Sequence, residues 1–168
     1  MTLKIFIRQM QASDWQFVAL IYKEGIKTSL ATFETEVPTW GKWDETHIKK
    51  CRLVAVFDNK IVGWAALSKV SERAVYKGVA EISVYVTKNI RGKKVGKQLL
   101  QNLIHESEKN NFWTLQASIF SENTISISLH KNLGFREIGY RERIAKINDV
   151  WKDNILMERR SKIIEINN

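Results

Sequence analysis

Hydrophobic and polar positions along the first half of the chain change between the period of a strand and the period of a helix. Ser13 stands three residues before Gln16, the spacing of a capping box at the start of a helix. Asp58 and Asn59 separate two apolar runs, which predicts a tight hairpin of two antiparallel strands. The elements predicted in this half are a strand at residues 3–9, a helix at 12–29, a short helix at 39–50 and a hairpin at 52–70.

The second half of the chain continues the alternation of strands and helices. The predicted elements are a strand at residues 79–87, a helix at 93–111, a strand at 112–120, a helix at 121–134 and strands at 135–143 and 150–159. The first of these helices gathers its apolar side chains on one face, namely Val95, Leu99, Leu100, Leu103 and Ile104. A hairpin followed by strand, helix and strand predicts a mixed, mostly antiparallel sheet with helices on both faces. We therefore expect an α/β fold of α+β character with about seven strands.

Composition points to one ordinary globular unit. A chain of 168 residues fits a single domain, 44% hydrophobic and 27% charged residues are near the average, and no compositional shift marks a linker, so residues 1–168 are expected to form one domain. No apolar run approaches the roughly 20 residues of a membrane helix, and the N-terminus lacks the apolar core of a signal peptide. Cys51 is the single cysteine, which excludes an internal disulfide. These features predict a cytoplasmic protein.

The strongly basic character of the chain does not by itself identify the partner. A net charge of +9 and a pI near 9.7 favour an acidic partner, which could be nucleic acid, an anionic membrane or a phosphorylated cofactor. The chain contains no recognition-helix, zinc or RNA-stacking motif. We therefore expect neither nucleic acid nor membrane as the partner, and a basic nucleic-acid-binding module remains the non-enzymatic alternative.

The stretch RGKKVGK, residues 91–97, stands between a predicted strand and the longest predicted helix. The first turn of a helix has unpaired amide hydrogens and partial positive charge, which phosphates bind. Gly92 and Gly96 remove side-chain bulk there, and one arginine and three lysines add charge. Three residues between the glycines, and Gln98 after the lysine, do not fit a Walker loop, and the G-x-G of a dinucleotide fingerprint is absent. The turn predicts a diphosphate site, the alternative being a basic turn that only caps the helix.

Residues 91–96 resemble the signature of the GNAT superfamily of N-acetyltransferases, Gln/Arg-x-x-Gly-x-Gly/Ala at the start of the central helix. Arg91 and Gly96 match it, whereas Lys94 replaces the usual first glycine. A lysine keeps the amide donor but disfavours a backbone with positive φ. The predicted order of elements is similar to that of the family over about residues 3–160. More narrowly, the chain resembles the phosphinothricin acetyltransferase branch in four stretches: ATFETEVPT, ERAVYKGVAEISVYV, SENTISISLHKNLGF and WKD.

The resemblance implies acetyl transfer from acetyl-CoA directly to the amino group of a small amino-acid-like substrate such as phosphinothricin, methionine sulfone or methionine sulfoximine. An ammonium group has no lone pair, so a general base must first remove a proton. Glu81 lies on the strand at 79–87, where partial burial would raise its pKa toward neutrality, and it matches the catalytic glutamate of the branch. The alternative for Glu81 is a structural salt bridge.

His130 is the second catalytic candidate, because the branch often carries histidine where many GNAT enzymes carry tyrosine. It could protonate the departing thiolate, or it could serve in packing or capping. His47, His105 and His130 fall on three separate predicted helices without metal-ligand spacing, so no metal is expected. Direct transfer needs no nucleophile, and Cys51 is expected to be a small buried hydrophobe.

The resemblance also implies the binding residues. For the coenzyme these are the backbones of Val84, Tyr85 and Val86 along an unpaired strand edge, the loop Arg91, Gly92, Lys93, Lys94, Val95, Gly96 and Lys97, and Asn123 at the pantetheine arm. For the acceptor they are Phe33, Glu34, Arg73 and Tyr76, with Arg73 gripping a carboxylate. Asn123 is equally natural as a helix N-cap, and Arg73 could simply be solvated.

Two further expectations concern the acceptor and the assembly. A polyamine, an aminoglycoside or a protein N-terminus is the alternative acceptor, but Arg73 beside the catalytic strand favours an amino acid over such cations. The branch resemblance also implies a homodimer.

Overall fold

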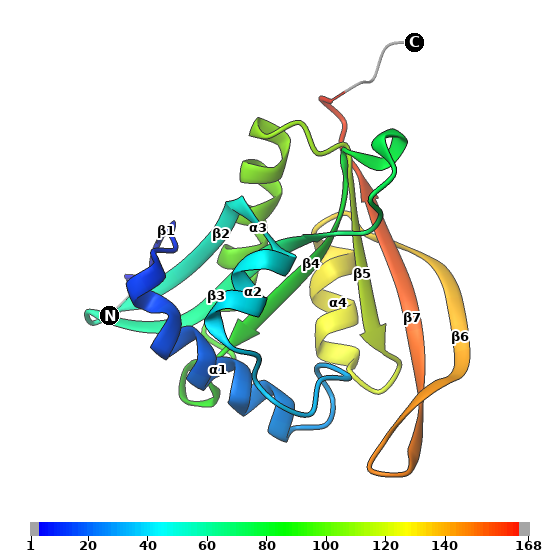
Figure 1. Ribbon diagram of the computed structural model, residues 1–168, viewed down its shortest axis with the longest axis horizontal. Helices are drawn as coiled ribbons and strands as arrows, with labels where there is room; N and C mark the ends of the chain where they lie inside the picture. Colours follow the sequence, from blue (N-terminus) through cyan, green and yellow to red (C-terminus); the bar gives the residue numbers. More distant parts are fainter. Residues whose placement is uncertain (1–3, 165–168) are drawn as a thin grey trace.

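The computed structural model describes residues 4–164, which fold around one seven-stranded sheet (Figure 1). Its strands lie in the order β1-β2-β3-β4-β5-β7-β6, and only β4 and β5 run parallel. The strands are β1 (Phe6–Gln9), β2 (His47–Phe57), β3 (Lys60–Lys69), β4 (Val79–Val86), β5 (Thr114–Phe120), β6 (Arg136–Ile147) and β7 (Val150–Arg160). The helices are α1 (Trp15–Lys27), α2 (Trp40–Thr46), α3 (Val95–Lys109) and α4 (Thr124–Asn132). The predicted mixed sheet is confirmed, and each predicted strand and helix is present, with different bounds at residues 12–14 and 47–50.

Two hydrophobic cores lie on opposite faces of the sheet, each beneath the helices that cover that face in Figure 1. One core joins β2, β3, β4 and β5 to α3 and α4, and it contains all five apolar residues predicted on one face of the central helix. The other joins α1 and α2 to β2 and β3 through an aromatic group in which Trp43 and Trp64 are almost completely buried. Helices therefore cover both faces, as the alternation of elements predicts.

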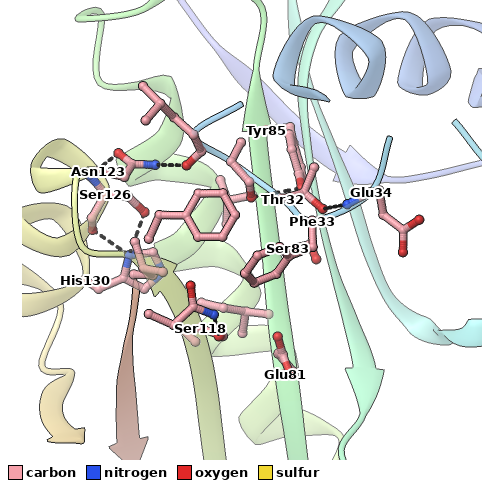
Figure 2. A pocket seen from close by; sticks show the side chains of 18 of the residues that line it. Thr32, Phe33, Glu34, Glu81, Ser83, Tyr85, Ser118, Asn123, Ser126 and His130 are labelled. Atoms are coloured by element: carbon pink, nitrogen blue, oxygen red, sulfur yellow. Dashed lines mark hydrogen bonds between the residues drawn. The ribbon is translucent and has the colours of Figure 1, made fainter. Parts of the chain in front are cut away.

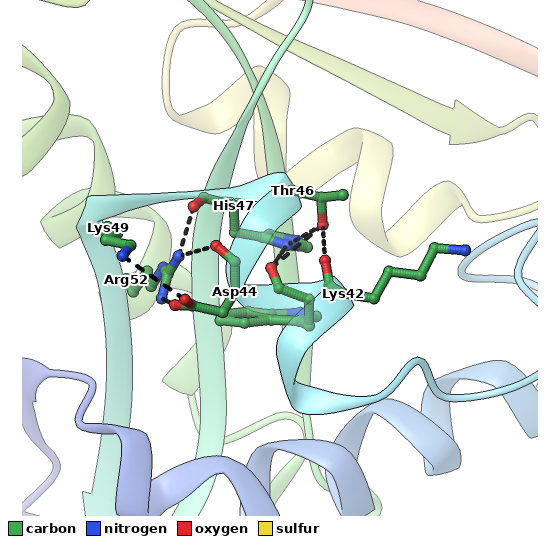
Figure 3. Close-up of polar contacts among 7 residues, drawn as sticks. Lys42, Asp44, Thr46, His47, Lys49 and Arg52 are labelled. Atoms are coloured by element: carbon green, nitrogen blue, oxygen red, sulfur yellow. Dashed lines mark hydrogen bonds and ion pairs between the residues drawn. The ribbon is translucent and has the colours of Figure 1, made fainter.

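The second predicted helix is shorter than its sequence pattern suggests, because α2 ends at Thr46 and β2 begins at His47. The guanidinium of Arg52 stops it: it donates to the Asp44 carboxylate at 2.5 Å, to the Asp44 carbonyl oxygen at 2.7 Å and to the His47 carbonyl oxygen at 2.5 Å (Figure 3). A cation on the last carbonyl groups of a helix favours its end there. His47 therefore starts a strand rather than lying on a helix.

The start of α1 also differs from the prediction. Ser13 is not the cap; a single 3-10 turn at residues 12–14 precedes the helix, and the carboxylate of Asp14 accepts the Gln11 backbone N–H at 2.8 Å. Arg8 on β1 holds the same carboxylate with two hydrogen bonds of 2.7 and 2.9 Å. The turn is thus fixed to the first strand.

The feature of the sheet that positions the site is the divergence of β4 from β5. They pair only through Val79, Ala80 and Glu81, whereas β4 stays paired with β3 as far as Val86. On its other side, β5 stays paired with β7 as far as Phe120. From Ile82 onward, β4 therefore presents an unpaired edge to the gap between the two strands.

No helix within residues 4–164 has both the length and the apolar character needed to cross a membrane.

Candidate active site

A cleft of about 270 Å³ lies where β4 and β5 separate (Figure 2). The loop at residues 30–34 closes one side, and the first turns of α4 close the other. Seven predicted site residues line this cleft: Phe33, Glu34, Glu81, Val84, Tyr85, Asn123 and His130. Segments that lie almost a hundred residues apart in sequence thus form one concave surface, which is the usual form of a small-molecule site.

Glu81 occupies the point where the two strands begin to diverge. Burial raises the pKa of its carboxyl group, and the charge of Arg141 lowers it to a smaller extent. Within the described chain, no side chain forms a hydrogen bond or a close ion pair with this carboxylate, so the salt-bridge alternative finds no partner there. A carboxyl group with a raised pKa and a free oxygen in a cleft suits a general base.

His130 is buried beneath the cleft and is held in one orientation (Figure 2). Its Nδ1 lies 2.7 Å from the carbonyl oxygen of Ser126, and its ring meets the edge of Phe135 at 5.0 Å. A carbonyl only accepts, so Nδ1 carries the proton in this bond. Burial lowers the pKa of the imidazole. The neutral ring then presents Nε2 as a hydrogen-bond acceptor, and in this form Nε2 carries no proton that could be given to a departing thiolate.

Asn123 links two walls of the cleft (Figure 2). Its side-chain oxygen accepts the Ser126 backbone N–H at 3.2 Å, which makes it the N-cap of α4. Its amide nitrogen donates to the Leu30 carbonyl oxygen at 3.2 Å. The N-cap alternative is therefore confirmed, and the same side chain also ties the loop at 30–34 to the helix.

The predicted acceptor residues divide into two groups. Phe33 packs edge-on against Phe120 with ring centroids 4.6 Å apart, and both Phe33 and Glu34 face the cleft (Figure 2). Arg73 and Tyr76 do not line it: Tyr76 is 44% exposed, and the Arg73 guanidinium lies over its ring at 5.7 Å. The cation that acts on Glu81 is instead Arg141, from β6.

The loop before α3 keeps the backbone shape that a glycine would favour. Lys94 is the N-cap of α3 and has φ of 64° and ψ of 12°, in the left-handed region. Lys94 thus adopts the positive φ that a lysine disfavours, and its replacement of the usual glycine does not change the backbone shape. No described residue accepts a hydrogen bond from the backbone N–H of Val95, Gly96 or Lys97. These free donors at the positive end of a 15-residue helix fit a diphosphate.

The unpaired edge of β4 has a definite polarity. Thr87 donates its backbone N–H to the Val62 carbonyl oxygen, so in the alternation of an antiparallel ladder Tyr85 also bonds to β3. Val84 and Val86 then turn their N–H and C=O groups toward the gap, and the Val86 carbonyl accepts from Arg91 Nε at 3.2 Å. This arrangement fits an amide-bearing ligand on Val84 and Val86. The backbone of Tyr85, also predicted to bind it, is already engaged, and Tyr85 offers its side chain instead.

A family model described as the acetyltransferase (GNAT) family matches residues 15–135. The chain belongs to the GNAT acetyltransferase family. A phosphinothricin N-acetyltransferase from Alcaligenes faecalis is 31% identical, over 91% of this chain and 81% of that relative. An L-methionine sulfoximine/L-methionine sulfone acetyltransferase from Pseudomonas aeruginosa is 28% identical, over 90% of this chain and 92% of the relative. The crystal structure of a GNAT superfamily phosphinothricin acetyltransferase from Sinorhizobium meliloti, in complex with AcCoA, has 25% identity and a TM-score of 0.88, over 100% of this chain and 93% of that one.

The cleft of this GNAT acetyltransferase is also lined by residues that were not predicted from the sequence. Ser118 on β5 and Asn154 on β7 line the cleft together, and Ser126 orients His130. The period of two along β5 could have found Ser118, because Gln116 pairs with Glu81 and Ser118 follows on the same face. Asn154 stands out only once β7 is known to border the site. Across residues 4–164, no three His, Cys, Asp or Glu side chains gather as a metal site would require.

Proposed function

We propose that this enzyme transfers the acetyl group of acetyl-CoA directly to the amino group of a small amino-acid-like substrate of the phosphinothricin, methionine sulfone or methionine sulfoximine type. The observation that carries the proposal is the position of Glu81, a carboxyl with a raised pKa and no ion-pair partner among residues 4–164, at the point where β4 leaves β5. The names of the relatives from A. faecalis and P. aeruginosa support the acceptor class.

The residues present suit acetyl-CoA, which when bound supplies the acetyl group as an activated thioester. The free amides of Val95, Gly96 and Lys97 and the basic side chains of the loop would hold the diphosphate. The gap-facing backbone groups of Val84 and Val86 would pair with the amides of the pantetheine arm as an added strand does. The remaining predicted loop residues, Arg91, Gly92, Lys93 and Lys94, border the same end of α3.

Glu81 would take the proton from the acceptor's ammonium group, directly or through one water, and so free the lone pair that attacks. The raised pKa of Glu81 is closer to neutral pH, where a general base works best. His130, neutral and hydrogen-bonded through Nδ1, would place an acceptor atom at the floor of the cleft. No residue of the chain needs to form a covalent intermediate, and Cys51 is fully buried in the core.

The acceptor would lie between the 30–34 loop and β5. Phe33 and Glu34 would form its upper wall, and Phe120 would support Phe33 from behind. Arg73 and Tyr76 remain proposed acceptor residues outside the cleft lining. Arg141 is the cation whose charge lowers the pKa of Glu81, and its guanidinium could bind the carboxylate of the acceptor.

We also propose a cytoplasmic homodimer. The hairpin of β6 and β7 exposes several large apolar side chains, an area that a second copy would cover: Ile138, Tyr140, Ile144, Val150 and Trp151. A single buried cysteine is consistent with a reducing compartment. Light scattering after gel filtration would measure the assembly, and a monomer at micromolar concentration would refute the dimer.

Two measurements test the function in sequence. Calorimetric titration should first show that acetyl-CoA binds. A panel of amines with a free-thiol readout should then show transfer to amino acids ahead of spermidine, an aminoglycoside or a peptide N-terminus. Faster reaction with spermidine than with any amino acid would overturn the acceptor class. If acetyl-CoA did not bind and DNA bound tightly in a salt-sensitive way, the proposal that this protein is an acetyltransferase would be refuted.

A further inference from the structure

Asn154 on β7 has a side-chain amide of which only the nitrogen forms a hydrogen bond within residues 4–164. Its side chain is only 4% exposed and lines the cleft. Its Nδ2 donates to the hydroxyl oxygen of Ser118 at 2.7 Å, but its Oδ1 has no hydrogen-bond partner among residues 4–164. Burying an amide oxygen without a partner lowers stability. An unpaired buried acceptor in a cleft therefore indicates a ligand that pairs with it.

Ser118, Asn154 and Glu81 lie on one face of the sheet. Glu81 pairs with Gln116, and Ser118 follows two residues later with its side chain on the same side. Asn154 pairs with Phe120, which places it diagonally across from Ser118 on that face. The cleft thus holds the proposed base at one point and a Ser118/Asn154 pair on its β5–β7 side (Figure 2 labels Ser118 and Glu81).

The pair offers the cleft both donors and an acceptor. When Asn154 Nδ2 donates one N–H to the Ser118 hydroxyl oxygen, Asn154 Oδ1 is free to accept, and the second amide N–H and the Ser118 O–H are free to donate. When the amide is turned over, the serine donates to the amide oxygen and leaves both amide N–H groups and its own oxygen free. In both orientations at least one donor and at least one acceptor therefore remain free.

We propose that Ser118 and Asn154 form the subsite that selects the side chain of the acceptor, and that they favour a group carrying a donor and an acceptor side by side. A sulfoximine, with its S=O and N–H, and a primary carboxamide have this pattern. A sulfone or an ionised phosphinate has only acceptors and leaves the free acceptor of the pair without a donor, which specific sites reject. The proposal rests on the proposed amino-acid acetyltransferase function and assigns the specificity within it.

The test compares kcat/KM for L-methionine sulfoximine, L-methionine sulfone and L-glutamine, in the wild type and in the variants Asn154→Leu and Ser118→Ala. The wild type should prefer sulfoximine to sulfone by about 10-fold or more, the effect of one unpaired buried polar group. In Asn154→Leu this ratio should fall to near one, and in Ser118→Ala it should fall in the same direction. Asn102→Leu, on the exposed surface of α3, is the matched control and should keep the wild-type ratio.

The ratio of the two substrates is independent of the fraction of active enzyme, so a variant that folds poorly is still informative. Ser118→Ala removes the hydroxyl that accepts from Asn154 and leaves the Asn154 side chain in place. A wild-type ratio near one, or a ratio that neither variant changes, would overturn the subsite while leaving the proposed function intact. Absence of acetyl transfer to every amino acid tested, with acetyl-CoA still bound, would instead overturn the proposed function and the subsite with it.

Discussion

Replacing Glu81 with glutamine removes the proposed base and retains the shape of the side chain. A positioned general base contributes about 10²- to 10⁴-fold to a rate, so kcat should fall by that factor. Glu81 lies on the cleft side of β4, and the predicted diphosphate loop lies beyond the far end of the strand. The affinity for acetyl-CoA should therefore change little, which separates a chemical role from a binding role.

The same substitution has a predictable effect on stability. Burial raises the pKa of Glu81 above the ordinary 4.5. Between that value and the raised one, the folded protein binds more protons than the unfolded chain, so this group lowers the free energy of unfolding as pH rises through the window. Above the raised pKa the cost is constant. Glu81→Gln should therefore be more stable than the wild type near neutral pH, and the difference should vanish as the pH falls below the ordinary glutamate pKa.

Steady-state kinetics with a saturating amino-acid acceptor, calorimetry with acetyl-CoA and thermal melts across pH measure the three quantities. Glu142→Gln, an exposed carboxylate on β6, is the matched control and should leave all three near the wild-type values. In the wild type, kcat/KM should rise with pH as Glu81 ionises. Turnover within a factor of two of the wild type, with the acceptor in excess, would remove Glu81 from the mechanism.

Three further substitutions or measurements follow from local geometry. Lys94→Gly should raise the free energy of unfolding by about 1 kcal/mol because a glycine adopts φ of 64° without strain; Lys93→Gly, which has no positive φ to relieve, should not, and equal effects would contradict the strain. Asn123→Ala should lower the free energy of unfolding by about 1 kcal/mol through loss of the N-cap, and it should raise the KM for the acceptor by releasing the 30–34 loop. Asn123→Asp keeps the cap and should raise only this KM; thermal melts and steady-state kinetics measure the two effects. Cys51, whose thiol pKa burial raises to about 12, should resist a thiol reagent in the native protein and react once it unfolds, and rapid native labelling would contradict its burial.

The fold was predictable because local patterns agreed with the tertiary arrangement almost everywhere. Helix α3 could be read from its apolar face, and the β2–β3 hairpin from Asp58 and Asn59, both of which have positive φ as such turns require. The error at residues 47–50 has a side-chain cause: Arg52, a few residues further along the chain, binds the end of α2, and the hydrophobic pattern does not indicate that contact. Lys94 is a similar case, because its propensity is overruled by the chain around it.

The site was predictable where a single strand dictates geometry, and not where separate elements meet. Alternation along β4 is enough to place Glu81 on the cleft side, but the raised pKa depends on the loop, β5 and β6 around it. Arg73 was expected in the cleft because it matches the substrate loop that the branch resemblance implies. The cation whose charge lowers the pKa of Glu81 is instead Arg141, which the pairing of β6 with β7 brings near it. The proposed base can thus be located from one strand, whereas the proposed acceptor subsite consists of residues that only the assembled sheet brings together. For this reason a family resemblance indicates the type of reaction more precisely than it indicates the acceptor. Substitutions at Ser118 and Asn154, which come from two different strands, are therefore the proposed test of acceptor specificity.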